Sequence, residues 1–299
     1  MRSGRHDDAV TGGLAAAQRT RMADVAGMTN GNEPVAVVDR PAGGTGTGEV
    51  ATLPERRLLR DEVWLVLGLT FLASALWALF DIAARPSLAG TSSVLLDTGE
   101  GTTADLAARL LRNALAFVPV LLVVHLLHRA GETASHIGLS LRPPALLRRD
   151  VRHGVALAAL VGSVGLILYL AAVGAGINRN VLVIDGAGTW WAAPMWLVSS
   201  LRFAVTEEVI VVGYLLRRLA QLNWAPNRAL LASALLRGTY HLDQGLGGFA
   251  GNLAMGLLFG RIYQRTGRVV PLVVAHFLID AVAGIGFLAL RNRVGWLPS

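Results

Sequence analysis

Long apolar runs fill the chain from Val63 onward, and most polar positions fall between these runs. A helix needs about 20 residues to cross a bilayer, and most of the runs reach that length. The pattern therefore predicts an all-α polytopic membrane protein with about seven or eight transmembrane helices and a polar site within the membrane. The predicted spans lie near residues 63–84, 106–128, 153–175, 193–216, 228–244, 249–265 and 269–290.

The composition supports a membrane protein. Of the 299 residues, 53% are hydrophobic and 16% are charged, whereas a soluble domain carries about 25% charged residues. All 27 basic residues are arginines, and the absence of cysteine excludes disulfides and thiolate chemistry. The arginines lie between apolar runs and not on one polar face, so we expect a lipid bilayer and no nucleic acid as partner.

The domain organisation follows from the same pattern. Residues 1–62 are rich in Gly, Ala and Thr and show no sustained apolar period, which predicts a disordered cytoplasmic tail. Residues 63–190 are expected to form the N-terminal transmembrane helices. Residues 191–290 are expected to form a core that carries the polar site, and residues 291–299 a short C-terminal tail.

Arginines cluster before the first span and in alternate connections, and the opposite connections are more acidic. By the positive-inside rule this predicts a multi-pass protein of the cell membrane with a cytoplasmic N-terminus. An eighth partial helix would accommodate the last arginines of the chain. The clustered residues are Arg56, Arg57, Arg60, Arg129, Arg142, Arg148, Arg149, Arg152, Arg217, Arg218, Arg228, Arg261, Arg265 and Arg268.

Ionisable residues inside three of the apolar runs are the candidate site, because such residues are costly in a membrane and usually functional. Counting about 1.5 Å per helical residue from the cytoplasmic arginines places them roughly 12–20 Å below the surface, so we expect them to converge. They are Glu207 and Glu208 in the fourth span, Arg237 and His241 in the fifth, and His276 and Asp280 in the last.

These residue types suit hydrolytic chemistry. His241, His276 and Glu207 match the ligand set of a catalytic zinc site with one position left for water, which makes zinc a tentative cofactor. Asp280 lies one turn from His276 and would fix the imidazole tautomer, or bind metal or substrate itself. Adjacent glutamates point about 100° apart on a helix, so Glu207 and Glu208 cannot share one task. One of them would act as general base, and the other would be a ligand or an ion-pair partner. A purely structural ion-pair network would use the same residue types.

Other hydrolase signatures are absent from the sequence. There is no H-E-x-x-H zinc motif, no G-x-S-G segment, no G-x-G-D segment and no Gly-rich phosphate loop. The paired glutamates and two histidines remain as the candidate chemistry.

Their order resembles the CPBP intramembrane metalloprotease family, also called the Abi or CAAX-protease family, which includes type II CAAX prenyl endopeptidases. The family pattern is E-E-x-x-x-R, then F-x-x-x-H, then H-x-x-x-N or H-x-x-x-D. This sequence has Glu207-Glu208, then His241, then His276 with Asp280. The resemblance covers about residues 190–290, and the arginine-rich, alanine-rich text is typical of a high-GC bacterium.

Two positions depart from the family pattern. The family's arginine falls on Val212, and its phenylalanine falls on Arg237. Glu208 therefore lacks the partner that the pattern places four residues later on the same helix. We expect Arg237 to supply that charge from the neighbouring helix.

The resemblance implies an intramembrane endopeptidase that hydrolyses a membrane or membrane-proximal peptide. Glu207 would activate water, His241 would bind the metal or that water, and His276 with Asp280 would complete the site or stabilise the oxyanion. The alternatives are a proton-coupled transporter, which uses similar residues, and a catalytically silent membrane-binding or immunity protein. All the deep polar residues lie after Arg202, and this asymmetry favours an enzyme over a two-fold carrier.

Overall fold

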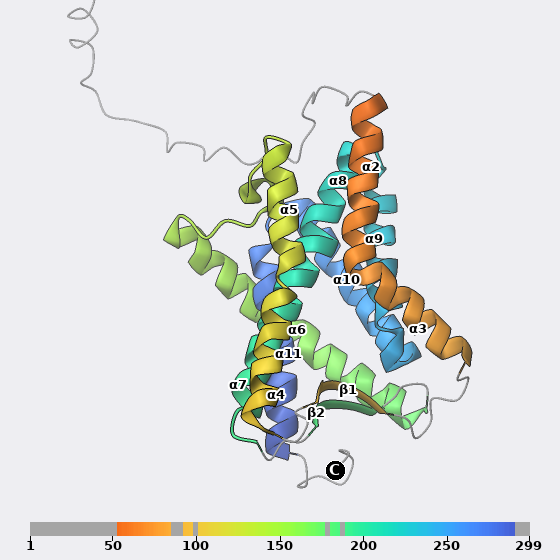
Figure 1. Cartoon of the computed structure of the whole chain (residues 1–299), viewed down its shortest axis with the longest axis vertical. Coiled ribbons are helices and arrows are strands. Elements are labelled where there is room, and N and C mark those ends of the chain that lie inside the picture. Colours follow the sequence, from red (N-terminus) through yellow and green to blue (C-terminus); the bar gives the residue numbers. More distant parts are fainter. Residues whose placement is uncertain (1–52, 85–91, 98–100, 177–179, 186–188, 291–299) are drawn as a thin grey trace, which may run out of the picture. The chain divides into compact units, whose positions relative to one another are not determined.

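The computed structural model describes residues 53–84, 92–97, 101–176, 180–185 and 189–290. All of them belong to Gly43–Ser299, one of two units into which the chain divides. Apart from one short two-stranded sheet, the secondary structure of these residues is helical (Figure 1).

The first part of the described chain forms three long helical stretches. The elements, in order, are α2 (Leu53–Leu67), the π-helical turn η1 (Gly68–Leu72), α3 (Ala73–Ala84), α4 (Thr103–Leu115), α5 (Val118–Arg129), the 3-10 helix η2 (Ala134–Ile137) and α6 (Pro144–Gly174). Helix α4 begins at a capping box, in which Thr102 and Asp105 bond each other's backbone N–H. Such a box satisfies N–H groups that the first helical turn leaves without partners.

The second part carries the candidate site. Its helices are α7 (Ala192–Glu207), the π-helix η3 (Glu208–Tyr214), α8 (Leu215–Gln221), α9 (Pro226–Tyr240), the 3-10 helix η4 (Leu242–Gln244), α10 (Leu246–Thr266) and α11 (Val270–Leu290). Proline at the first position of α9 is typical of a helix start. Gly267 ends α10 in the left-handed conformation at φ 63°, which glycine adopts without steric cost.

The sheet was not predicted. Strand β1 (Ser92–Asp97) pairs in parallel with β2 (Asn180–Asp185), with Ser92 opposite Asn180 and Asp97 opposite Asp185. The prediction of an all-α protein therefore needs this correction. Short apolar runs such as Val94-Leu95-Leu96 form a strand here because a second such run, distant in sequence, supplies the backbone hydrogen bonds.

Every predicted span falls on helical structure, but the number of membrane-crossing helices is confirmed only in part. Four stretches of the described residues are long and apolar enough to cross a membrane: Glu55–Ala84, Thr103–Arg129, Pro144–Ala172 and Val270–Leu290. The fourth predicted span is interrupted by three charged residues, Arg202, Glu207 and Glu208, and α9 has only 15 residues.

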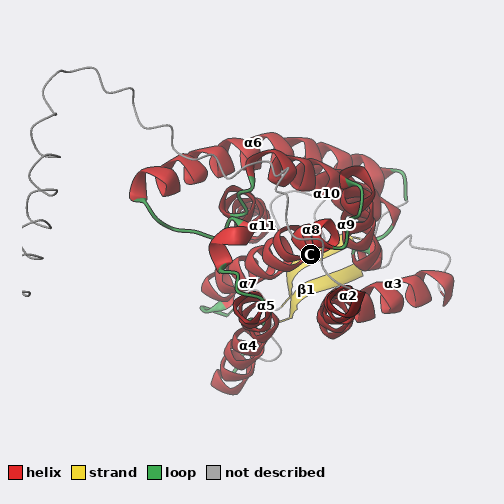
Figure 2. Ribbon diagram, turned by 90° about the horizontal axis from the view of Figure 1, so that it is seen from above, coloured by secondary structure: helices red, strands yellow, loops and turns green. Residues whose placement is uncertain are grey.

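The outer surface of these helices is apolar. Trp77 is 71% exposed and Leu69 is 70% exposed, and only a small share of the span in α6 is buried. Helix α6 runs along one side of the bundle beside α10 and α11 (Figure 2). Large apolar side chains on an outer surface are expected where helices face lipid, which supports a membrane protein.

Helix α2 begins at Leu53, so residues 53–62 are helical and the predicted tail boundary at residue 62 is wrong. The apolar run begins at Val63, but helix α2 starts ten residues earlier, in the polar segment before that run. The rest of the predicted tail, residues 1–52, lies outside the described residues, as does the predicted C-terminal tail at 291–299.

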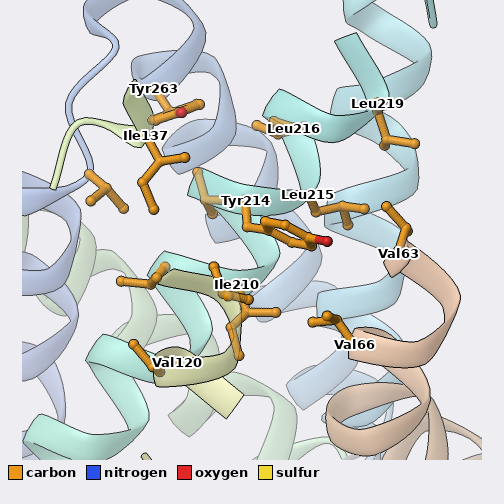
Figure 3. Packing of buried hydrophobic residues seen from close by; sticks show 14 of the residues in the cluster. Val63, Val66, Val120, Ile137, Ile210, Tyr214, Leu215, Leu216, Leu219 and Tyr263 are labelled. Carbon is orange, nitrogen blue, oxygen red and sulfur yellow. The ribbon is translucent and has the colours of Figure 1, made fainter. Parts of the chain in front are cut away.

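A buried apolar cluster joins the first helices to the site-bearing ones. Val63 and Val66 of α2 and Val120 of α5 pack with Ile210 and Tyr214 of η3 (Figure 3). Because this cluster surrounds the helix that carries both glutamates, it fixes where that helix lies.

Some arginines expected to mark the cytoplasmic surface are instead buried in ion pairs. Arg218 is fully buried, with Nη1 at 3.1 Å from Glu132 Oε2, and Arg217 also bonds Glu132. Arg268 pairs with the buried carboxylate of Asp150. Burial raises the pKa of Glu132, but the hydrogen bonds and charges of Arg217 and Arg218 outweigh burial and hold that pKa below its ordinary value.

Candidate functional site

The two glutamates lie where the α-helix changes to a π-helix. Glu207 is the last residue of α7 and Glu208 the first of η3. The hydroxyl of Ser233 donates to the carbonyl oxygen of Val211 at 2.7 Å. The Tyr263 hydroxyl donates to the carbonyl oxygen of Gly213, also in η3, at 3.2 Å. Side chains of α9 and α10 thus stabilise this π-helix, a form that is frequent at functional sites.

Arg237 of α9 bridges both glutamates. Its side chain is fully buried, with Nη1 at 2.7 Å from Glu208 Oε1. Its other terminal nitrogen, Nη2, lies 3.5 Å from Glu207 Oε2. The contact predicted between Arg237 and Glu208 is therefore confirmed.

Helix α10 makes room for this arginine. A Cβ atom on Gly256 would lie 3.0 Å from Ala234 Cα and 3.2 Å from Arg237 Cδ. The guanidinium carbon of Arg237 lies 5.6 Å from the ring centre of Phe259, within the range of cation–π attraction. The close approach of α9 and α10 thus depends on a residue without a side chain.

His276 of α11 faces a carboxylate on each ring nitrogen. Nδ1 lies 2.8 Å from Glu208 Oε1, and Nε2 lies 3.4 Å from Asp280 Oδ2. Arg237 Nη2 is also 3.2 Å from Nδ1. The ring therefore links the glutamate of η3 to the aspartate one turn further along α11.

Trp196 of α7 holds this part of α11. Its indole N–H donates to the carbonyl oxygen of Asp280 at 2.8 Å. A Cβ atom on Gly284 would lie only 2.0 Å from Trp196 Nε1, so the indole reaches that carbonyl because residue 284 is glycine.

His241 lies at the edge of the cluster. It is the C-cap residue of α9, and its Nδ1 lies 2.9 Å from the carbonyl oxygen of Arg237. Its ring centre is 4.6 Å from that of Tyr240. Among the described residues, no hydrogen bond or ion pair joins His241 to Glu207 or His276.

Tyr240 belongs to the cluster and was not predicted from the sequence. Its hydroxyl donates to Glu207 Oε2 at 2.8 Å, and its ring stacks on Phe71 of η1 at 4.7 Å. A tyrosine in an apolar run gives no sequence signal beyond that of a core aromatic residue. The one available signal was its position beside His241.

The two glutamates differ in their surroundings. The Glu208 side chain is fully buried, with both of its contacts on Oε1, and Oε2 has no partner among the described residues. The Glu207 side chain is 7% exposed, and both of its contacts fall on Oε2. Glu208 thus has the shorter contact with Arg237, at 2.7 Å against 3.5 Å, and the two contacts of Glu207 leave its Oε1 outside them.

The predicted zinc ligands do not come together as a set. Within the described ranges, no group of three or more His, Asp or Glu side chains is arranged to hold a metal ion. His276 directs both ring nitrogens at carboxylates, and His241 directs Nδ1 at a backbone oxygen. Zinc therefore stays a prediction, and no chemical step is derived through it.

Comparison with known proteins bears on residues 189–282. These residues match the family model of the Type II CAAX prenyl endopeptidase Rce1-like proteins. No curated protein and no solved structure matches the chain. The match contains all six residues singled out from the sequence and overlaps the predicted core at 191–290. The match confirms the resemblance inferred from the motifs: residues 189–282 are similar to the Type II CAAX prenyl endopeptidase Rce1-like proteins.

Proposed function

We propose that the protein is an intramembrane endopeptidase of the CPBP type that hydrolyses a peptide bond with water activated by Glu207. The observation that carries this proposal is the unequal treatment of the two glutamates. Glu208 is fully buried and contacts Arg237 at 2.7 Å and His276 at 2.8 Å, whereas Glu207 is 7% exposed, accepts a hydrogen bond from the neutral Tyr240 hydroxyl and meets Arg237 only at 3.5 Å. The family match supports a protease.

In the proposed reaction, Glu207 accepts a proton from water, and the hydroxide attacks the carbonyl carbon of the scissile bond. The resulting oxyanion needs a nearby donor, a role we assign to the N–H at Nε2 of His276, which would turn to it from the longer 3.4 Å contact with Asp280 Oδ2 while Nδ1 stays on Glu208. The C–N bond then breaks as Glu207 returns its proton to the leaving nitrogen. The products are a new carboxyl terminus and a new amino terminus.

His241 completes the proposed site on the side of α9. Its Nδ1 faces the carbonyl oxygen of Arg237, which favours the tautomer with the proton on Nδ1. The other ring nitrogen, Nε2, would then accept a hydrogen bond from the attacking water. We propose a membrane or membrane-proximal peptide segment as the substrate, because the outer helices are apolar.

Mapping of protein termini tests this function even though the substrate is not identified. Membranes of cells that express the wild type, Glu207→Gln or the exposed control Asp61→Asn are compared by mass spectrometry. We expect at least one membrane-protein terminus that the wild type and Asp61→Asn produce and Glu207→Gln does not. Identical termini in all three membranes would contradict a protease and favour a silent binding protein.

A further inference from the structure

Arg237 and Tyr240 lie three residues apart on α9, a spacing that places two side chains on one face of a helix. Both side chains reach across to the glutamate pair of α7 and η3. Arg237 Nη1 contacts Glu208 at 2.7 Å, and the Tyr240 hydroxyl contacts Glu207 at 2.8 Å. Each glutamate therefore has its own hydrogen-bond donor from the same face of α9.

We propose that Arg237 and Tyr240 act as a pair of positioning residues that fix the orientation of the two carboxylates. Arg237 holds Glu208 and His276 in one charged unit. Tyr240 holds Oε2 of Glu207, so that Oε1 is the oxygen available to water. The proposal rests on the proposed function and deepens it, because it names the residues that orient the general base Glu207.

The surroundings of Tyr240 fit this role. The ring stacks on Phe71, which lies in η1 of the first helical stretch and outside the residues that match the family. With its ring fixed between η1 and α9, the hydroxyl has few directions to point. A donor fixed before the reaction costs no reorganisation when charge changes on its partner.

The surroundings of Arg237 fit as well. The side chain is fully buried between α9 and α10, with Gly256 and Phe259 against it. Val212, where the family pattern has arginine, is buried in the apolar cluster. The positive charge beside Glu208 therefore comes from α9 and not from η3.

Labelling with dicyclohexylcarbodiimide tests the pair independently of any catalytic activity. This reagent reacts with carboxyl groups in apolar surroundings, and mass spectrometry reports the labelling rate at each glutamate of the purified protein. Tyr240→Phe keeps the ring on Phe71 and removes only the hydroxyl. Because this variant frees Glu207 Oε2 from its 2.8 Å hydrogen bond, we expect labelling of Glu207 to become about 10-fold faster or more.

The matched control is Tyr263→Phe, which removes another buried hydroxyl that bonds η3 but touches neither glutamate. Its labelling rate at Glu207 should equal that of the wild type. An unchanged rate in Tyr240→Phe, or an equal increase in Tyr263→Phe, would overturn the role of Tyr240.

Arg237 is tested by removing its charge. Glu208 should resist labelling in the wild type and become labelled in Arg237→Phe. Glu208 that stays protected in Arg237→Phe would overturn the role of Arg237. Because labelling needs no substrate, these results stand even where terminus mapping rejects the protease.

Discussion

Arg237 Nη1 lies 2.7 Å from Glu208 Oε1, although the two residues are 29 positions apart and on different helices. Both side chains are fully buried. A buried ion pair of this kind adds little net stability, but removal of one partner leaves an uncompensated charge. The pair thus ties α9 to η3 at the level of the candidate site.

Single substitutions at this pair should therefore be costly and non-additive. We expect Arg237→Gln and Glu208→Gln each to lower the free energy of unfolding by about 3–5 kcal/mol, because each removes the 2.7 Å partner of a fully buried charge. The double variant should cost clearly less than the sum. Unfolding in detergent, followed by circular dichroism, measures all three.

The exposed pair Arg60 and Asp61, with nitrogen and oxygen 3.8 Å apart, serves as the control. Exposed ion pairs contribute little, so its double-mutant cycle should show no measurable coupling. Additive losses at Arg237 and Glu208 would show that the two residues do not interact as described.

Much of this site was predictable from the sequence. Ionisable residues are conspicuous in apolar runs, and their spacing from flanking arginines placed them at similar depth. The contact of Arg237 with Glu208 followed from a missing arginine at position 212. In contrast, the role of Tyr240 was not predictable from its position beside His241 alone, because its hydroxyl meets Glu207 only once α9 lies against the end of α7.

The fold shows the same division. Helices were predictable because apolar runs of sufficient length have few other solutions in a membrane. The pairing of β1 with β2 was not, since it joins distant segments. Nor was the burial of Arg218 and Arg268, because the pattern shows that an arginine ends a span but not which acid it meets.

Gly284→Ala should disturb the site from α11. A Cβ atom at this position would lie 2.0 Å from Trp196 Nε1, so the indole that bonds the Asp280 carbonyl must move. We expect a loss of about 1–3 kcal/mol in the free energy of unfolding, as for other overpacked positions. Gly286→Ala is the control on the same helix, because no atom lies within 4 Å of its added Cβ. Equal stability of the two variants would refute the contact.

The ion pairs of Glu132 should make the stability of the protein depend on pH. Its pKa is below the ordinary value in the folded protein, so its contribution is present above the unfolded pKa of about 4.3 and is lost as the pH falls through the folded pKa. The difference in unfolding midpoint between the wild type and Glu132→Gln should be largest at neutral pH and shrink below about pH 4.3. A difference that is constant with pH would contradict the ion pairs with Arg217 and Arg218.

The zinc prediction is tested by elemental analysis of the detergent-purified protein. It expects about one zinc per chain, lost in His241→Ala and His276→Ala and kept in Glu207→Gln. In the structure, however, both ring nitrogens of His276 face carboxylates. If this arrangement persists, the zinc content will not depend on His276. Zinc that disappears with either histidine would show that the ligands assemble when the metal binds.

Hydrolysis in heavy-oxygen water is the most direct test of Glu207 as the base. The wild type and Glu207→Gln are reconstituted in liposomes with a membrane protein found by terminus mapping, and the products are weighed by mass spectrometry. We expect the wild type to yield a new carboxyl terminus carrying one heavy oxygen, and Glu207→Gln to yield none. Labelled product at an equal rate from Glu207→Gln would contradict the role of Glu207 as the base.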